Sequence, residues 1–336
     1  MKQHNEKEFL AYWLSVFLLD ELTSKRNYSI NTQKSYRDTF ILFFDYMQSE
    51  HEVDVMKIKI DHIVPENIIA FLDFYEQKNS WSAKTRNHRL AAIKSFCKFY
   101  AQNCIENASR IMATLHIYSK KEIVPTIDYL TKDEICSLLG VPNRNLKLGN
   151  RNYLLLLFLY NTGARVSEVA QVRVCDLRKN TDDWFVKLHG KGKKDRDCPL
   201  WPQTATELSE HISMCHLLPE DQLFAGIRNG SITRHGVYSV IKNMVDSAKV
   251  KIPSLLKKSI TPHSLRHTAA IHLLQSGSDI VTISKWLGHN SIETTNKYIT
   301  IDLETKNAAV QKCSISTPQT KPKWRDENLR KLLKSI

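Results

Sequence analysis

The chain has 336 residues, enough for two domains, and a formal net charge of +13 from 48 Lys and Arg against 35 Asp and Glu. Residues 1–124 carry 17 basic and 15 acidic side chains, whereas the remainder carries 31 and 20. Positive charge concentrated in one part of a chain indicates a polyanionic partner, chiefly nucleic acid. A generally basic soluble protein has the same balance, so the charge alone does not decide the function.

The composition argues against secreted, zinc-binding and membrane proteins. The seven cysteines are scattered and form no C-x-x-C pair, and an odd, unpatterned set fits reduced thiols better than a disulfide framework or a zinc site. The apolar stretch Phe9–Leu19 runs into Asp20 and Glu21, so it is not a signal peptide. Tyr153–Tyr160 is an apolar run of buried-helix length only. We expect a soluble protein of the bacterial or archaeal cytosol.

Four helices are predicted in the N-terminal part of the chain. Apolar spacing places them at Phe9–Thr23, Ile30–Gln48, Pro65–Tyr75 and Ala83–Tyr100. Ser29 and Ser82 precede two of these helices as N-caps. The outward edges carry the cations Lys34, Arg37, Lys84, Arg86 and Arg89. These are candidate DNA contacts, although ordinary solvated helix faces carry such residues too.

A change of pattern divides the chain. Residues 117–128 contain lysines and Pro125 without apolar periodicity, which predicts a linker between a domain of residues 1–116 and one of residues 129–315. In the second domain, Thr131 and Glu134 form a capping-box pattern. The other predicted elements are helices at Lys132–Leu139, Asn150–Asn161, Thr204–His216 and from Thr233 to Ala248, and strands at Trp184–Leu188 and Asp197–Trp201.

The stretch Ile260–Thr300 carries side chains suited to phosphate chemistry. Pro262 begins a predicted helix in which His263 and Arg266, three residues apart, share a face. A second helix, Asp279–Leu287, ends at Gly288, so that His289 follows a helix end. Tyr298 lies nine residues further on, in a helix predicted at Thr294–Ile299. Guanidinium and imidazole groups hold oxyanions, and a phenol can attack one.

Two upstream motifs accompany this stretch, and together the four resemble one family. N-T-G-A-R-V-S-E at residues 161–168 turns on Gly163 and presents Arg165, and H-G-K-G-K-K-D-R at residues 189–196 is a glycine-rich turn between the predicted strands. The ordered motifs T-G-x-R-x-S-E, G-K-G-x-K-x-R, H-x-L-R-H-T and L-G-H followed by Tyr are similar to those of the tyrosine recombinase (phage integrase) family. They span roughly Leu130–Lys312.

The resemblance implies a mainly α fold with a small β-hairpin or sheet. It implies an N-terminal four-helix SAM-like domain that binds DNA, joined to an α-rich catalytic domain. The implied activity is site-specific recombination through a 3′-phosphotyrosine intermediate, which integrates, excises or resolves DNA. The implied partners are double-stranded DNA with inverted repeats and other copies of the chain, a dimer on each site and a tetramer on two. Sister recombinases or accessory proteins are further possible partners.

The resemblance also assigns roles that the chemistry requires. Attack of the Tyr298 phenol on a phosphodiester adds negative charge, which Arg165, Arg266 and His289 would stabilise. A free tyrosine has a pKa of about 10, so it needs nearby positive charge and a proton acceptor, for which His263 is the candidate. Lys191 would protonate the leaving 5′-oxygen. Lys193 and Lys194 are expected to contact phosphates, and Glu168 to support Arg165. The scheme needs no metal or other cofactor.

Three other functions are consistent with parts of the sequence. A type IB topoisomerase would use the same chemistry without strand exchange. A catalytically inactive DNA-binding protein is disfavoured because every motif position is filled. A zinc enzyme would need His263 and His267 as ligands, but the glutamate of H-E-x-x-H is missing.

The C-terminal residues 316–336 form a predicted tail. Ser314–Lys323 is polar and rich in Ser, Thr and Pro, whereas Leu329, Leu332, Leu333 and Ile336 recur at helical spacing. This tail helix would dock either on a neighbouring protomer or on its own domain.

Overall fold

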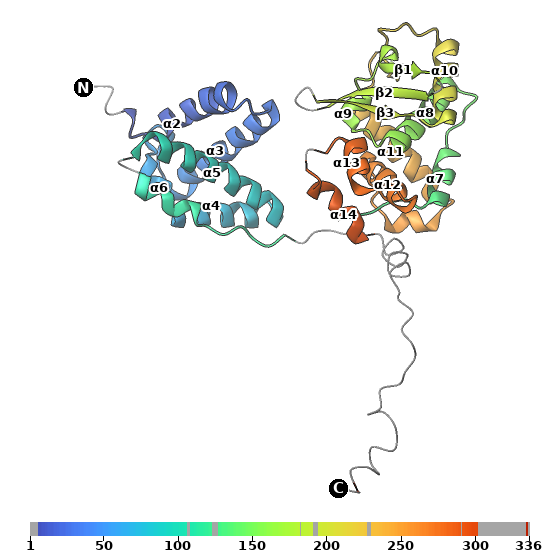
Figure 1. The fold of residues 1–336 in the computed structure, drawn as a ribbon. Helices are drawn as coiled ribbons and strands as arrows, with labels where there is room; N and C mark the ends of the chain where they lie inside the picture. The colour runs from blue at the N-terminus through green and yellow to red at the C-terminus, as the bar shows by residue number, and fades with distance from the viewer. Residues whose placement is uncertain are drawn as a thin grey trace. The chain divides into compact units, whose positions relative to one another are not determined.

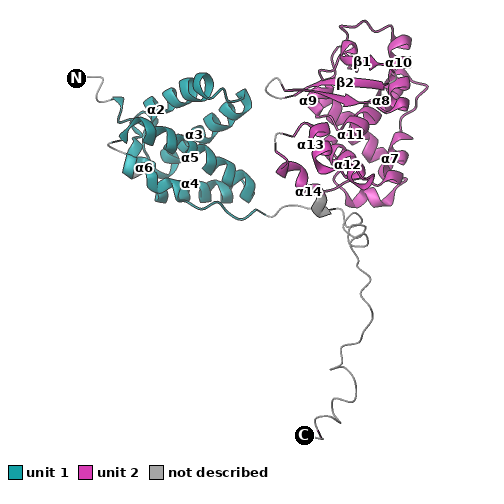
Figure 2. Cartoon of the chain, viewed as in Figure 1, with its two compact units in different colours: residues 1–125 teal, residues 126–336 magenta. Residues whose placement is uncertain are grey.

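The structure is a computed structural model that describes residues 6–105, 108–122, 127–181, 183–190, 194–226, 230–289, 291–301 and 334. The chain divides into two compact units, residues 1–125 and 126–336 (Figure 2). The division falls within the stretch 117–128, and each unit has its own hydrophobic core. Apart from Lys334, the predicted tail helix lies outside the described residues. None of the described helices is long and apolar enough to cross a membrane.

Among the residues that the structure describes, the N-terminal unit contains the four predicted helical regions and one further helix (Figure 1). Its helices are α2 (Leu10–Val16), continued by the π-helical η1 (Phe17–Lys25), then α3 (Ile30–His51), α4 (Pro65–Lys78), α5 (Ala83–Asn103) and the unpredicted α6 (Ala108–Leu115). The short 3₁₀ segments η2 (Val55–Lys57) and η3 (Ile60–His62) connect α3 to α4. The predicted N-caps are confirmed, because the Ser29 and Ser82 hydroxyls accept from the backbone N–H groups of Thr32 and Thr85.

Aromatic side chains hold this unit together. Phe96 of α5 contacts Phe17 and Phe40 edge-on, with ring centroids 5.5 and 5.3 Å apart, and Phe43 contacts Phe71 at 5.5 Å. All five rings are fully buried or nearly so. Edge-to-face contacts add to the burial of apolar area, so α3, α4, α5 and η1 share one core.

The C-terminal unit places a three-stranded antiparallel sheet among helices (Figure 1). The sheet has the order β1 (Leu177–Asn180), β2 (Asp183–His189), β3 (Asp195–Pro199). The two predicted strands are confirmed, but β1 was not predicted, because it has only four residues and is mostly exposed. The helices are α7 (Lys132–Leu139), α8 (Lys147–Thr162), α9 (Val166–Val169), α10 (Pro202–Cys215), α11 (Arg234–Lys249), α12 (Pro262–Gln275), α13 (Ile280–Leu287) and α14 (Glu293–Ile301), with the 3₁₀ segments η5 (Val174–Asp176) and η6 (Pro253–Lys257).

Two buried helices, α8 and α12, form the centre of this unit. Leu154–Leu159 is buried all round in α8, and 11 of the 14 residues of α12 are buried. A helix buried on every side needs no polar face, so its polar residues must find partners inside the protein. In α12 these include Arg266 and His267, and the contacts of these two side chains define the candidate site.

Candidate active site

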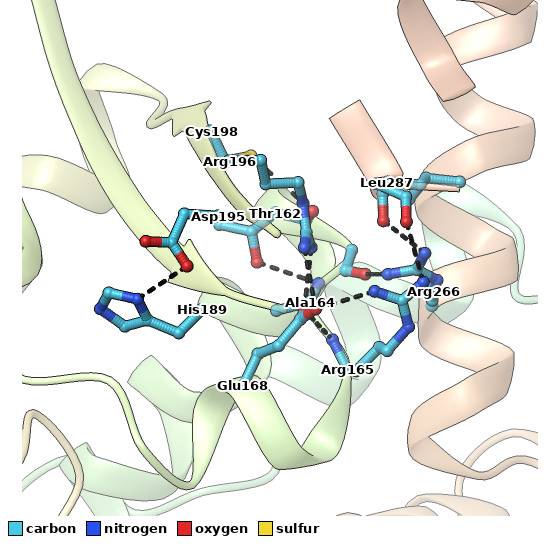
Figure 3. A network of polar contacts seen from close by, with 12 residues as sticks. Thr162, Ala164, Arg165, Glu168, His189, Asp195, Arg196, Cys198, Arg266 and Leu287 are labelled. Carbon is cyan, nitrogen blue, oxygen red and sulfur yellow. Dashed lines mark hydrogen bonds and ion pairs between the residues drawn. The ribbon is translucent and has the colours of Figure 1, made fainter. Parts of the chain in front are cut away.

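The C-terminal end of α13 holds three arginines in a row. Trp286 O accepts from Arg196 Nε at 2.9 Å, Leu287 O from Arg266 Nη2 at 2.5 Å, and Gly288 O from Arg165 Nη2 at 3.0 Å. The last carbonyls of a helix have no partner within the helix and carry partial negative charge. Three consecutive carbonyls therefore set the positions of three guanidinium groups that come from different elements. Figure 3 shows these three arginines with Leu287, whose carbonyl accepts from Arg266.

Glu168 of α9 lies beneath this array and is its acidic partner. Its carboxylate, 3% exposed, accepts from the backbone N and Nη1 of Arg165 at 2.7 and 2.8 Å, and from Arg196 Nη1 and Nη2 at 2.8 Å each. Burial by itself raises the pKa of Glu168, but the contacts of Arg196, and then of Arg165, hold it below its ordinary value. The supporting role expected of Glu168 agrees with this geometry.

The array has more positive charge than Glu168 can neutralise. Burial, together with the charges of Arg165 and Arg196, lowers the pKa of Arg266 to about 9. Arg266 donates from Nη1 to Gly163 O at 2.7 Å, so it is fixed at both ends of its guanidinium. A charged group whose protonated form is disfavoured by its neighbours gains stability when an anion approaches. This concentration of positive charge therefore favours the approach of an anion.

Tyr298 lies next to the arginines and is fully buried, at 0% exposure, in a small cluster with Ile271 and Leu287. Its hydroxyl is 2.8 Å from His267 Nδ1, and its ring stacks at 6.5 Å on the ring of His289. Burial raises the pKa of Tyr298 to about 12, and the charge of Arg266 opposes that effect. In this arrangement the phenol keeps its proton at neutral pH.

The partner of the phenol differs from the one expected. His263 is exposed, and its ring lies 4.6 Å from that of His267, which faces Tyr298. The sequence motif places His263 and Arg266 on one face of α12. The packing of α14, however, places the Tyr298 hydroxyl against His267. Among the described residues, no three His, Cys, Asp or Glu side chains are grouped in a way that could hold a metal.

Sequence reasoning missed two residues of the site, Arg196 and His267. Arg196 is the last residue of the glycine-rich motif at residues 189–196, so the motif itself was a signal for it. His267 directly follows Arg266, but it was considered only as a metal ligand. Both acquire their partners from residues that are distant in the chain: Trp286 is 90 residues from Arg196, and Tyr298 is 31 residues from His267.

The lysines of the glycine-rich turn are only partly described. Lys191 and Lys193 lie outside the described residues, whereas Lys194 is exposed and its carbonyl accepts from Gly190 N at 3.1 Å. This bond and the pairing of His189 with Asp195 close the end of the β2–β3 hairpin. The roles expected of Lys191 and Lys193 remain predictions.

The structure corrects one of the predicted DNA contacts in the N-terminal unit. Lys34, Arg37 and Lys84 are exposed, as a contact surface requires. Arg86 is 4% exposed and pairs with Asp73 at 2.9 Å and Glu76 at 3.1 Å on α4, so the prediction of an outward DNA-binding side chain is wrong for this residue. A buried arginine needs such acidic partners, and a helical spacing pattern does not reveal them.

Arg89 is half-buried and joins two helices of the N-terminal unit. Its Nη1 donates to Ser35 O and Thr39 Oγ1 of α3, each at 3.0 Å. These bonds account for Arg89 within the fold, and its expected DNA contact remains a prediction.

Gly288 is expected to be essential to the arginine array. Its φ is +63°, and an added Cβ would lie 2.9 Å from Arg196 Cδ. Left-handed backbone costs a non-glycine residue roughly 1–2 kcal/mol. Gly288→Ala should lower the melting temperature and slow phosphodiester cleavage. Gly277→Ala is the matched control, because Gly277 has φ +92° and no atom within 4 Å of the added Cβ. Equal cleavage by the two variants would contradict the contact with Arg196.

His189 predicts a pH-dependent contribution to stability. Nε2 is 3.0 Å from Asp176 Oδ1. On the other side of the ring, Nδ1 is 3.1 Å from Asp195 Oδ1 (Figure 3). Both nitrogens donate only when the ring is protonated, and the bonds to Asp176 and then Asp195 raise the pKa of His189. The stabilisation is complete below the unfolded pKa of about 6.5 and is lost as pH rises through the higher folded pKa.

The melting temperature of the wild type should therefore exceed that of His189→Gln most at about pH 6, and the difference should shrink towards higher pH. Calorimetry from pH 5.5 to 8.5 measures it. His235→Gln, at an exposed histidine of the same unit, controls for the loss of an imidazole. A difference that stays constant with pH would show that the pair of contacts does not depend on protonation.

A buried phenol beside three arginines, on a helical unit, is the set of groups that an enzyme using a tyrosine to cleave phosphodiesters would require. The sequence profile of the Phage integrase family matches residues 128–304, and that of the Phage integrase, N-terminal SAM-like domain matches residues 17–103. The chain belongs to the phage integrase family of tyrosine recombinases and is a site-specific DNA recombinase.

Individual relatives agree with this assignment. The putative integrase/recombinase y4rC of Sinorhizobium fredii (strain NBRC 101917 / NGR234) is 33% identical over 327 residues, which cover 97% of this chain and 98% of the relative. Tyrosine recombinase XerD of Oceanobacillus iheyensis is 32% identical over 283 residues, 82% of this chain and 90% of that protein. These relatives give no support to the topoisomerase alternative.

Solved structures share the fold. The XerH site-specific recombinase bound to palindromic difH substrate matches with a TM-score of 0.69 at 21% identity, covering 85% of this chain and 81% of that one. The Tn1549 transposon integrase in complex with transposon right end DNA also matches with a TM-score of 0.69, at 16% identity, covering 89% and 98%. The predicted fold, mainly α with a small sheet and a SAM-like N-terminal domain, is confirmed.

Proposed function

We propose that Tyr298 is the nucleophile of this recombinase and that it forms a 3′-phosphotyrosine bond with DNA at a specific site. The observation that carries the proposal is the array on α13, where Arg165, Arg196 and Arg266 bond to consecutive carbonyls beside the phenol. Arg165 and Arg266 bind the non-bridging oxygens of the scissile phosphate, and His289 supplies a further donor. Lys191 protonates the leaving 5′-oxygen.

Tyr298 must move before it reacts. A side chain with no exposed surface cannot reach the phosphorus of a DNA backbone, and its raised pKa keeps the phenol protonated. The bond to His267 therefore belongs to a resting arrangement. Movement of α14 that takes the Tyr298 hydroxyl out of its buried position and closer to the guanidinium groups would lower the pKa of the phenol, because the phenol gains nearby positive charge and loses burial.

His263 is the proposed acceptor of the phenol proton once Tyr298 has moved, and two variants test this. His263→Gln is expected to slow formation of the covalent adduct by about 10²–10⁴-fold, the range for a lost general base. His267→Gln, which keeps a hydrogen-bonding side chain beside Tyr298, is expected to retain most of the rate. The rates are measured under single-turnover conditions. A larger loss in His267→Gln would transfer the role to His267.

The proposed DNA partner and the proposed assembly are inferred from solved structures that share the fold. A lambda integrase dimer is described bound to a core site and a lambda integrase tetramer bound to a Holliday junction. We propose that this chain likewise binds an inverted-repeat site as a dimer and joins two sites as a tetramer. Its excess of basic residues after residue 124, and the exposed Lys34, Arg37 and Lys84, supply charge for the DNA backbone. A role in a mobile element agrees with the transposon integrase among the neighbours.

The test uses DNA that flanks the coding region. Nicked duplexes that contain inverted repeats of about a dozen base pairs are incubated with the full chain, and products are separated on a denaturing gel. The expected result is a covalent protein–DNA adduct on one repeat sequence and exchange between two such sites. Relaxation of supercoiled DNA at many sequences, without exchange, would instead support a topoisomerase.

A further inference from the structure

Arg196 connects three elements of the site. It extends from β3, donates to Glu168 on α9 through both terminal nitrogens, and donates to Trp286 O on α13 through Nε. Only 10% of its side chain is exposed. Figure 3 shows it on the side of Glu168 opposite Arg165. A side chain so enclosed has little room for a phosphate of its own.

The charge of Arg196 determines how strongly the Glu168 carboxylate attracts the guanidinium of Arg165. Glu168 is buried and ionised, and Arg165 and Arg196 are the cations that pair with it. A buried carboxylate that lost the bidentate Arg196 would draw the Arg165 guanidinium onto itself, because Arg165 would be its remaining ionic partner. With Arg196 present, Arg165 gives Glu168 one N–H of its guanidinium and gives Gly288 O another. Three of its five donors are left for an oxyanion.

The shape of Arg196 fixes the turn to which Arg165 is bound. Its Cδ and Nη1 lie 2.9 and 3.1 Å from the place where a Cβ of Gly288 would be. The side chain thus packs directly beneath Gly288, whose carbonyl accepts from Arg165 and whose successor is His289. A shift of this turn would move one contact of Arg165 and the backbone of His289 together.

We propose that Arg196 is a positioning residue for Arg165: it occupies the Glu168 carboxylate and supports the Gly288 turn, so that the Arg165 guanidinium stays directed towards the scissile phosphate. The inference rests on the proposed function, in which Arg165 contacts that phosphate. It gives the last residue of the glycine-rich motif a task separate from that of Lys191.

A double-mutant cycle tests this role. Arg196→Lys keeps the positive charge but loses the bidentate geometry, so it is expected to slow adduct formation by about 10²-fold, the effect of a misplaced catalytic group. Arg165→Ala should have an equal or larger effect. If Arg196 acts through Arg165, the double variant should be as slow as Arg165→Ala alone. Multiplication of the two losses would overturn the proposal.

A second substrate separates positioning from general damage. A methylphosphonate at the scissile position has one negative charge fewer, so it depends less on a second guanidinium. The rate of Arg165→Ala relative to the wild type should rise on this substrate. The relative rate of Arg196→Lys should rise by the same share. Equal defects of Arg196→Lys on both substrates, with recovery of Arg165→Ala, would also overturn the proposal.

The controls address folding and the proposed function. Melting temperature and DNA affinity of Arg196→Lys are measured alongside, and Arg196→Gln replaces it if the lysine variant does not fold. Arg173→Lys is the matched control, since Arg173 pairs with Glu220 on the surface of the same unit. If the wild type forms no adduct through Tyr298, the proposed function fails. If the wild type reacts and the cycle is additive, only the role of Arg196 fails.

Discussion

Tyr298→Phe is expected to abolish covalent attachment to DNA while leaving site-specific DNA binding intact. The substitution removes one oxygen atom, which is the attacking atom in the proposed reaction and the partner of His267 in the resting structure. The ring and its contacts with Leu287 and His289 remain. The measurement compares adduct on a nicked duplex, resolved on a denaturing gel, with affinity from a mobility-shift titration.

Tyr160→Phe is the matched control for this substitution. Tyr160 lies in the same unit, and its hydroxyl is 2.8 Å from His272 Nδ1, so the variant loses the same kind of tyrosine–histidine bond away from the arginines. It should form the adduct at the wild-type level. An adduct of normal yield in Tyr298→Phe would place the nucleophile at another residue and would contradict the proposed function.

Lys191→Ala is expected to slow cleavage of ordinary DNA by about 10²–10⁴-fold, the contribution typical of a general acid. The defect should largely disappear on DNA with a 5′-bridging phosphorothiolate, because a thiolate leaves without being protonated. Rates of adduct formation on the two substrates give the ratio. Lys194→Ala serves as the control, since Lys194 is exposed near the end of the same hairpin. Equal losses of Lys191→Ala on both substrates would restrict Lys191 to DNA binding.

Local sequence was sufficient where structure depends on neighbours in the chain. The caps at Ser29, Ser82 and Thr131 act on N–H groups three residues away, and Gly288 ends α13 through its own backbone angle. Such signals are complete within one helical turn. For this reason most of the longer helices, the two longer strands and the order of the motifs could be predicted.

The partners of the buried charges could not be predicted in this way. The spacing of Arg86 predicts an outward-facing side chain. In the structure it is buried and pairs with Asp73 and Glu76 on another helix. Whether an arginine faces DNA or a carboxylate depends on what packs against it, because a buried charge is tolerated only when it is paired. The short strand β1 was not predicted for a similar reason, because its pairing with β2 defines it as a strand more than its own four residues do.

The sequence by itself determined the family, the two-part architecture and most of the chemical groups of the site, because these depend on residue identity and spacing. Only the tertiary structure decided how the groups meet. It brought β3, α9, α12 and α13 together so that Arg196, Arg266 and Arg165 bond to three successive carbonyls. It also set Tyr298 against His267 and not His263. Contacts between residues up to 123 positions apart follow from how the helices pack, and no local pattern encodes them.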